Sequence, residues 1–356
     1  MSEPVLSVRG LSVDYALAEP VHAVREVDLE LRRGEIVGLA GESGCGKSTL
    51  AYAVNRLLRP PAEVVAGTVT FHDRTVGDID LLRLRGEELR RFRWRRMAMV
   101  FQGAMNALNP VLTVRAQFED LLRAHRPELG TVARRQRAGE LLELVAVDPR
   151  RLRSYPHELS GGMRQRVMIA MALALNPDVV VLDEPTTALD VVVQREILRE
   201  ITALREQFGF AVLFITHDLS LLLEISDRIA VMYAGRVVEE GSAGRLFDHP
   251  MHPYSVGLLN SFPSLTGPRR ELHGIPGRPP DLAGEQDRCA FEPRCPYARP
   301  VCGEVRPPLV AHPAAPGGTD GRAACHAHEP RVYGEATPTA LLDGEFGPVA
   351  AAEVVP

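Results

Sequence analysis

A glycine-rich loop constrains the fold of this chain more than any other part of its sequence. The loop is Gly41–Thr49 and has the sequence GESGCGKST. It follows AVREVDLELRRGEIVGLAG, which alternates apolar and polar residues as a half-buried strand does, and it precedes STLAYAVNRLL, which has helical spacing. The order strand, glycine loop, helix is typical of an α/β unit built on a parallel sheet.

The spacing of this loop predicts a phosphate site. Gly41-x-x-x-x-Gly46-Lys47-Ser48 is the Walker A pattern, in which glycines let backbone N–H groups turn toward phosphates at a helix N-terminus. Lys47 is predicted to reach the β- and γ-phosphates of ATP, and Ser48 to hold Mg²⁺. Cys45 occupies a variable position as a small filler. The predicted nucleotide-contacting residues of the loop are Gly41, Ser43, Gly44, Cys45, Gly46, Lys47, Ser48 and Thr49.

Lys47 is also the only lysine in the chain. All other basic residues are arginine. A single lysine in such a composition indicates a position that requires a compact point charge on a flexible stem and does not fit a planar guanidinium.

Two purely apolar runs, 179–182 and 211–215, are typical of strands buried on both faces of a parallel sheet. The first run ends in Asp183 and Glu184, so a buried strand is predicted to deliver Asp183 to the metal while Glu184 polarises water. The second run ends in Thr216-His217-Asp218, which places His217 to contact the γ-phosphate. A strand that ends in two acids by chance is an unlikely explanation beside a Walker A loop.

Composition narrows the remaining function classes. The net charge of −5 disfavours nucleic acid as the main ligand. The basic stretch 83–96 is interrupted by Glu87 and Glu88, which favours a solvated helical face over a nucleic-acid patch. No stretch has the features of a signal peptide or of a membrane span, so we expect any membrane role to depend on partner chains.

The chain has 356 residues, enough for more than one structural unit. Residues 113–175 are mostly helical in pattern, which predicts a helical insertion in the α/β core. Near Phe262 proline and glycine become dense and periodicity fades, so we predict a boundary there. The tail 331–356 is small, acidic and featureless, and we expect it to be disordered. There is no internal repeat, which excludes two tandem cassettes in this chain.

A family resemblance becomes specific at Leu159-Ser160-Gly161-Gly162-Met163-Arg164-Gln165, which looks like the ABC signature motif. Other elements of ABC ATPases occur in the same order over residues 3 to about 330. Gln102 resembles the Q-loop, Ala188-Leu189-Asp190 the D-loop, His217 the switch histidine, and Tyr15 the aromatic that stacks on adenine. The resemblance implies a P-loop NTPase with a RecA-like, mostly parallel sheet, an antiparallel β subdomain and a helical subdomain at about 103–175.

The resemblance also implies roles for individual residues. Glu184 would be the general base, His217 would stabilise the γ-phosphate, and Gln102 would join Ser48 and Asp183 at Mg²⁺. The signature residues Ser160, Gly161, Gly162 and Gln165 would form a second anion nest at a helix start, acting on a partner's ATP. Two ATP molecules would then lie between two ATPase subunits. A non-hydrolysing regulatory dimer conflicts with the intact Glu184 and His217.

Four cysteines crowd the region after the predicted boundary, with the spacing Cys289-x5-Cys295-x6-Cys302-x22-Cys325. Structural disulfides are improbable beside a cytosolic ATPase domain, and the spacing lacks the paired C-x2-C of zinc ribbons. Four thiolates with loose spacing fit either an iron–sulfur cluster or zinc, and His326 and His328 are possible nitrogen ligands. We therefore expect a small Cys-rich C-terminal extension with a structural metal centre.

This region resembles the C-terminal extension of oligopeptide and dipeptide permease ATP-binding subunits. The resemblance is carried by RPPDL at 278–282, CAFEPRCPYA at 289–298 and Cys325-His326, together with Asn109-Pro110 and His252-Pro253-Tyr254. It implies a [4Fe–4S] cluster on the four cysteines, and predicted domains of 1–262 for the nucleotide-binding domain and 263–330 for the extension.

The resemblance to these permease subunits also implies partners. They are a second, related ATPase subunit, two integral membrane permease subunits and an extracellular solute-binding protein, with this chain peripheral on the cytoplasmic face of the cell membrane. The alternative is a soluble ABC ATPase that acts on ribosomes or nucleic acid and has its own iron–sulfur centre. Such proteins are expected to have two cassettes or a long coiled-coil insertion, and neither occurs here.

Overall fold

The computed structural model describes residues 3–103, 107–187, 189–261, 274–284, 287–311 and 321–328. The predicted disordered tail 331–356 and Ala188 of the predicted D-loop lie outside the described residues. The strands are β1 Pro4–Tyr15, β2 Val21–Arg32, β3 Ile36–Ala40, β4 Ala62–Asp73, β5 Gly77–Asp80, β6 Met97–Val100, β7 Val179–Asp183, β8 Ala211–Ile215, β9 Arg228–Tyr233, β10 Arg236–Ser242, β11 Val310–Ala311 and β12 Arg322–Ala323.

The helices alternate with these strands through most of the chain. The α-helices are α1 Lys47–Val54, α2 Gly86–Phe92, α3 Val114–His125, α4 Thr131–Leu144, α5 Gly161–Ala172, α6 Val191–Phe208, α7 Leu219–Ile225, α8 Ala243–Asp248, α9 Pro253–Asn260 and α10 Pro300–Glu304. The short 3-10 helices are η2 Pro149–Arg153, η3 Pro156–Glu158, η4 Glu292–Arg294 and η5 His326–His328. No helix among these described residues is long and apolar enough to cross a bilayer.

Two sheets organise the molecule. The larger sheet has the strand order β11-β12-β10-β9-β3-β8-β7-β6, and the pairs from β9 to β6 are parallel. The smaller sheet, β2-β1-β4-β5, is antiparallel. The arrangement agrees with the expected mostly parallel core and antiparallel β subdomain.

The parallel strands are buried on both faces, as their apolar runs predict. On β7, Val180 and Leu182 pack with the helices α5, α6 and α7, whereas Val179 and Val181 pack on the opposite face with the smaller sheet and α1. Every residue of β7 and β8 is buried. Because side chains alternate along a strand, one five-residue run supplies two hydrophobic cores.

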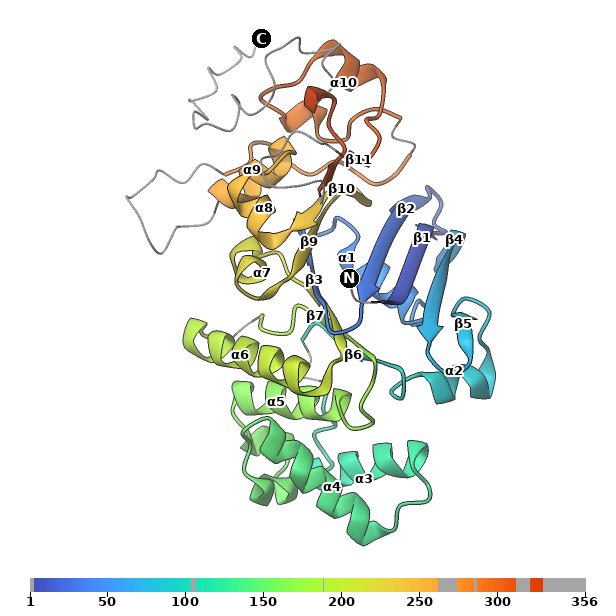
Figure 1. Cartoon of the computed structure of the whole chain (residues 1–356), viewed down its shortest axis with the longest axis vertical. Helices are drawn as coiled ribbons and strands as arrows, with labels where there is room; N and C mark the ends of the chain where they lie inside the picture. The colour runs from blue at the N-terminus through green and yellow to red at the C-terminus, as the bar shows by residue number, and fades with distance from the viewer. Residues whose placement is uncertain are drawn as a thin grey trace.

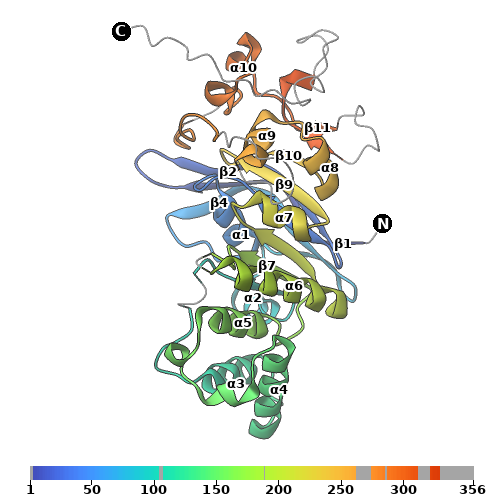
Figure 2. The same ribbon diagram turned by 90° about the vertical axis from the view of Figure 1, so that its left-hand side faces the viewer.

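The helices α3, α4 and α5 gather at one end of the molecule, and α10 lies at the opposite end, with the larger sheet between them (Figure 1 and, turned by 90°, Figure 2). The helical insertion therefore projects from the sheet away from the C-terminal elements.

The basic stretch 83–96 contains α2, where Glu87 forms ion pairs with Arg90 and Arg91 on the exposed surface.

The region after residue 262 is attached to the main sheet. β12 pairs antiparallel with β10, and β11 pairs with β12, so both extend the larger sheet beyond β10. The sequence pattern did not predict this pairing with the main sheet. Two-residue strands carry no period-2 pattern, so the sequence gives no sign of them.

Candidate nucleotide site

The glycine loop joins the carboxyl end of β3 to the start of α1. Gly41, Gly44 and Gly46 have φ angles of 149°, 79° and 105°. A Cβ on Gly46 would lie 2.1 Å from the Ala23 carbonyl oxygen, so the backbone path requires glycine there. The loop therefore has the glycine-dependent conformation that the Walker A pattern predicts, and it ends at the N-terminus of a helix.

Lys47 is buried at the centre of this loop, with 5% of its surface exposed. Its Nζ donates hydrogen bonds to the carbonyl oxygens of Gly41 and Glu42, at 2.7 and 2.8 Å. The Cys45 thiol lies 3.7 Å from the same ammonium, and burial raises the pKa of that thiol. The only lysine of the chain thus lies in a narrow backbone cage, with Cys45 as packing around it.

Ser48 and Asp183 meet across the loop. Ser48 Oγ donates a hydrogen bond of 3.1 Å to Asp183 Oδ1, while Asp183 Oδ2 is buried with no hydrogen-bond partner among the described residues. Burial raises the pKa of Asp183, although the hydrogen bond from Ser48 opposes that rise. A buried carboxylate oxygen with no partner, beside a serine hydroxyl, fits the oxygen-ligand chemistry of Mg²⁺.

Three side chains from separate segments converge on Glu184, which follows β7 with a positive φ of 45°. Gln102 Nε2 and Thr187 Oγ1 donate to Glu184 Oε2 at 2.8 and 3.0 Å, and His217 Nδ1 lies 3.3 Å from Oε1. The structure thus brings together all three predicted catalytic residues. Thr187 was not predicted, and its position three residues after Glu184 was the only available signal.

Tyr15 lies beside the start of α1, where its hydroxyl is 3.2 Å from Thr49 Oγ1. Ser43 and Gly44 are exposed at the tip of the loop. All other predicted nucleotide-contacting residues belong to the glycine loop itself. Tyr15, at the end of β1 in the smaller sheet, lies beside this loop.

The predicted signature begins α5. Ser160 is exposed and caps the helix by accepting a hydrogen bond of 3.2 Å from the Met163 N–H, and Gly161 and Gly162 form its first turn. A Cβ on Gly162 would lie 2.7 Å from Val193 Cγ1 of α6. Gln165 is placed differently, because it is only 1% exposed and its Nε2 has no hydrogen-bond partner within the residues that the structure describes.

Comparisons with known proteins agree with this geometry. Residues 24–187 match the family model described as ABC transporter. The probable peptide ABC transporter ATP-binding protein y4tR of Sinorhizobium fredii is 45% identical over 86% of this chain and 91% of its own length. The chain belongs to the ABC transporter ATP-binding family.

Other comparisons relate this ABC protein to ATP-binding proteins of peptide transport. Residues 238–302 match the model of the oligopeptide/dipeptide transporter C-terminal region. The dipeptide transport ATP-binding protein DppD of Bacillus subtilis is 43% identical over 86% of this chain and 90% of its own length. The oligopeptide transport ATP-binding protein OppD of Mycobacterium tuberculosis is 44% identical over 96% of this chain, but the chain spans only 56% of that relative.

Solved structures show the same fold. The ATP-binding cassette MJ0796, solved as a dimer in a post-hydrolysis state bound to ADP and Pi, superimposes with a TM-score of 0.59 at 31% identity. It covers 67% of this chain and 98% of its own length. The remainder of the ABC chain thus lies outside this match.

The predicted D-loop of the ABC fold starts α6. The Asp190 carboxylate caps this helix by accepting hydrogen bonds from the N–H groups of Val192 and Val193, at 3.2 and 3.0 Å. The side chains of Val191 and Val192 are 65% and 68% exposed. Two neighbouring apolar side chains therefore face solvent beside the D-loop.

The four clustered cysteines of the C-terminal region line one pocket of this ABC chain: Cys289, Cys295, Cys302 and Cys325. Burial, followed by the nearness of Cys289 and Cys302, raises the pKa of Cys295 to about 12. Burial also raises the pKa values of Cys289 and Cys325. All four are free thiols, and within the described ranges no three His, Cys, Asp or Glu side chains are grouped closely enough to hold a metal ion. The expected metal centre thus has no support in the geometry of the described residues.

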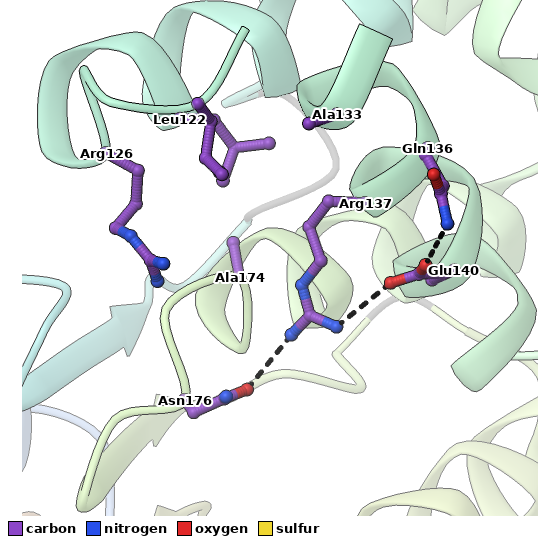
Figure 3. A pocket seen from close by; sticks show the side chains of 9 residues that line it. Leu122, Arg126, Ala133, Gln136, Arg137, Glu140, Ala174 and Asn176 are labelled. Atoms are coloured by element: carbon purple, nitrogen blue, oxygen red, sulfur yellow. Dashed lines mark hydrogen bonds and ion pairs between the residues drawn. The ribbon is translucent and has the colours of Figure 1, made fainter.

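A further pocket of about 340 Å³ lies among α3, α4 and the segment after α5 (Figure 3). Arg137 is one of the lining residues, and it donates to Asn176 Oδ1 at 3.0 Å and to Glu140 Oε2 at 3.4 Å. Its polar groups largely pair with one another, and none of the predicted site residues lines it. We assign it no part in the nucleotide chemistry.

Proposed function

We propose that this chain is the ATP-hydrolysing, energy-coupling subunit of a membrane importer for dipeptides or oligopeptides. The observation that carries the ATPase part is the convergence of Gln102, Thr187 and His217 on Glu184, beside the pair Ser48–Asp183. The match of residues 238–302 to the oligopeptide/dipeptide transporter region, together with the names of the relatives, supports peptide import.

Each predicted residue then has a role in phosphoryl transfer. Lys47 leaves the carbonyl oxygens of Gly41 and Glu42 to bind the β- and γ-phosphates, while Ser48 and Asp183 would hold Mg²⁺, which neutralises phosphate charge. Glu184 orients and deprotonates the attacking water. Gln102 and His217 hold the Glu184 carboxylate from two sides, and His217 is placed to contact the γ-phosphate. Catalysis is then mainly positioning and electrostatics.

The second half of the site is proposed to come from another subunit. Ser160 is exposed at the N-terminus of the twelve-residue helix α5, where a helix dipole favours an anion. The solved relative is a dimer bound to ADP and Pi, which supports the same assembly here. Ser160, Gly161 and Gly162 would contact the ATP of the partner, and the buried Gln165 would support the turn from inside.

The proposed assembly has two ATPase subunits, two integral permease subunits and an extracellular solute-binding protein. The chain would be peripheral on the cytoplasmic face of the membrane, with a related ATPase as its partner. Within it we propose a nucleotide-binding domain at 1–262, containing a helical subdomain at about 103–175, and an extension at 263–330.

Co-purification from detergent-solubilised membranes tests this function. Recovery of the tagged chain with integral permeases, and stimulation of ATP hydrolysis by a peptide-loaded binding protein, are the expected results. Recovery with ribosomes or nucleic acid instead would overturn the proposal and favour the soluble alternative. The Glu184→Gln variant should assemble equally well but lose the stimulated hydrolysis.

We also propose that Cys289, Cys295, Cys302 and Cys325 hold a [4Fe–4S] cluster. Their chemistry fits, because four thiols line one buried pocket. A single zinc ion would need four sulfurs at about 2.3 Å from one point. A [4Fe–4S] cluster instead takes one cysteine thiolate on each iron, which matches the number of cysteines here.

Iron and acid-labile sulfide assays on anaerobically purified protein, with visible and EPR spectra, test this second proposal. We expect about four irons per chain, and loss of iron in Cys302→Ser but not in the control Cys45→Ser. Stoichiometric zinc without iron would refute the cluster.

A further inference from the structure

Glu42 links the phosphate loop to the C-terminal region, and the nucleotide chemistry above does not use its side chain. Arg294 forms a two-point ion pair with it, Nη1 to Oε2 at 2.6 Å and Nη2 to Oε1 at 3.0 Å, across 252 residues of sequence. The Arg294 side chain is only 4% exposed, against 27% for Glu42. A buried, bidentate arginine–carboxylate pair is among the stronger polar contacts in proteins.

All five N–H groups of the Arg294 guanidinium have acceptors. Besides Glu42, Nη1 donates to the Tyr233 hydroxyl at 3.3 Å, Nε donates to the Pro276 carbonyl at 2.7 Å, and Nη2 donates to the Ile275 carbonyl at 3.5 Å. The rings of Tyr233 and Phe291 lie 5.8 and 6.0 Å from the guanidinium carbon. The guanidinium is thus fixed in one orientation, aimed at the loop.

The backbone of Glu42 is held as well. Its N–H donates to the hydroxyl of Tyr254, a fully buried residue of α9, at 2.8 Å. Its carbonyl oxygen accepts one of the two hydrogen bonds from Lys47. Glu42, which contacts Lys47, is therefore held by Arg294 through its side chain and by Tyr254 through its backbone.

We propose that Arg294 is a positioning residue for ATP binding: it holds Glu42, and with it the phosphate loop around Lys47, and it neutralises a carboxylate that would otherwise repel the phosphates. Arg294 touches no nucleotide in this scheme and acts only through Glu42. The inference rests on the proposed ATP-binding function and adds the C-terminal region to the nucleotide site.

Charge gives the proposal a distinctive signature. Removing Arg294 alone leaves Glu42 as an unpaired carboxylate beside an anion site, which is worse than removing both charges. A merely structural role for Arg294 would make the double variant at least as weak as the single one. The two models therefore predict opposite orders of ATP affinity.

The experiment measures the affinity of the full-length chain for MgATP by equilibrium dialysis, with thermal unfolding as a check on folding. We expect Arg294→Gln to weaken ATP binding about tenfold or more, in the range of typical coupling between sites. Adding Glu42→Gln to that variant should recover at least about threefold of the loss. The control is Arg306→Gln, which removes another ion pair of the same region, with Glu26 at 3.0 Å, and should bind ATP as the wild type does.

The outcomes separate the hypotheses. Wild-type affinity in Arg294→Gln, or a double variant no tighter than Arg294→Gln, overturns the positioning role while leaving ATP binding intact. If the wild-type chain itself does not bind ATP, the proposed function is wrong. If Arg294→Gln does not fold, Arg294→Lys decides: it keeps the charge but lacks the five-donor fork, so its affinity should fall about fivefold, and an unchanged affinity overturns the proposal.

Discussion

Gln102 donates a hydrogen bond of 2.8 Å to the carboxylate of Glu184, 82 residues further along the chain. Gln102 follows β6 and Glu184 follows β7, and these two strands are parallel neighbours. Parallel strands end at the same edge of a sheet, so both residues lie at the carboxyl edge where ligands of α/β proteins bind.

Glu184→Gln should bind ATP with nearly unchanged affinity but hydrolyse it at least about 100-fold more slowly, because the amide cannot accept a proton from water. Phosphate release and ATP binding, measured on the same preparation, test this. Glu206→Gln, an exposed change on α6, is the control and should leave both quantities unaltered. Near-normal hydrolysis in Glu184→Gln would contradict the assigned role.

Lys47→Arg should weaken ATP binding about tenfold although it keeps the positive charge. The Lys47 ammonium lies between two backbone carbonyl oxygens at 2.7 and 2.8 Å, and the bulkier planar guanidinium of arginine would not reproduce this compact point charge. Isothermal titration with MgATP measures the change. Full affinity would show that the single lysine is an accident of composition.

Asp183→Asn should raise the Mg²⁺ concentration needed for half-maximal hydrolysis by at least about tenfold. The reason is that Asp183 Oδ2 is buried and has no hydrogen-bond partner in the described part of the chain, which leaves it available to a cation. Titrating Mg²⁺ at fixed ATP gives the constant. An unchanged Mg²⁺ requirement would place the metal elsewhere.

Cys295 in the metal-free folded chain should react slowly with iodoacetamide at pH 8. The thiolate is the nucleophile, and burial raises the pKa of this thiol to about 12, so little thiolate is present. Peptide mapping should show alkylation at least about tenfold slower than in the urea-unfolded chain. Equal rates in both states would mean that Cys295 is open to solvent.

The sequence indicated those parts of the fold whose signals are local. The apolar runs 179–182 and 211–215 correspond to β7 and β8, and the helical pattern after Thr113 corresponds to α3, α4 and α5. Walker A was recognisable because its glycines must take positive φ angles. The ends of the two apolar runs predicted Glu184 and His217 for the nucleotide site, whereas the part of Gln102 was implied only by the family resemblance.

What the sequence could not indicate depends on contacts between distant segments. β12 is two residues long and gains its strand character only by pairing with β10. The ion pair of Arg294 with Glu42 has no local pattern at either end. The cysteine spacing suggested a common site, but which side chains line it depends on packing that no spacing encodes.

Arg294 also lies between Cys289 and Cys295, in the short helix η4, and Cys295 ends that helix. Thermodynamic linkage is reciprocal: if ordering this segment through Arg294 tightens ATP binding by some factor, ATP must stabilise the segment by the same factor. ATP binding would then change the stability of the segment that contains Cys289 and Cys295. The reactivity of the cysteine pocket would then report whether ATP occupies the loop.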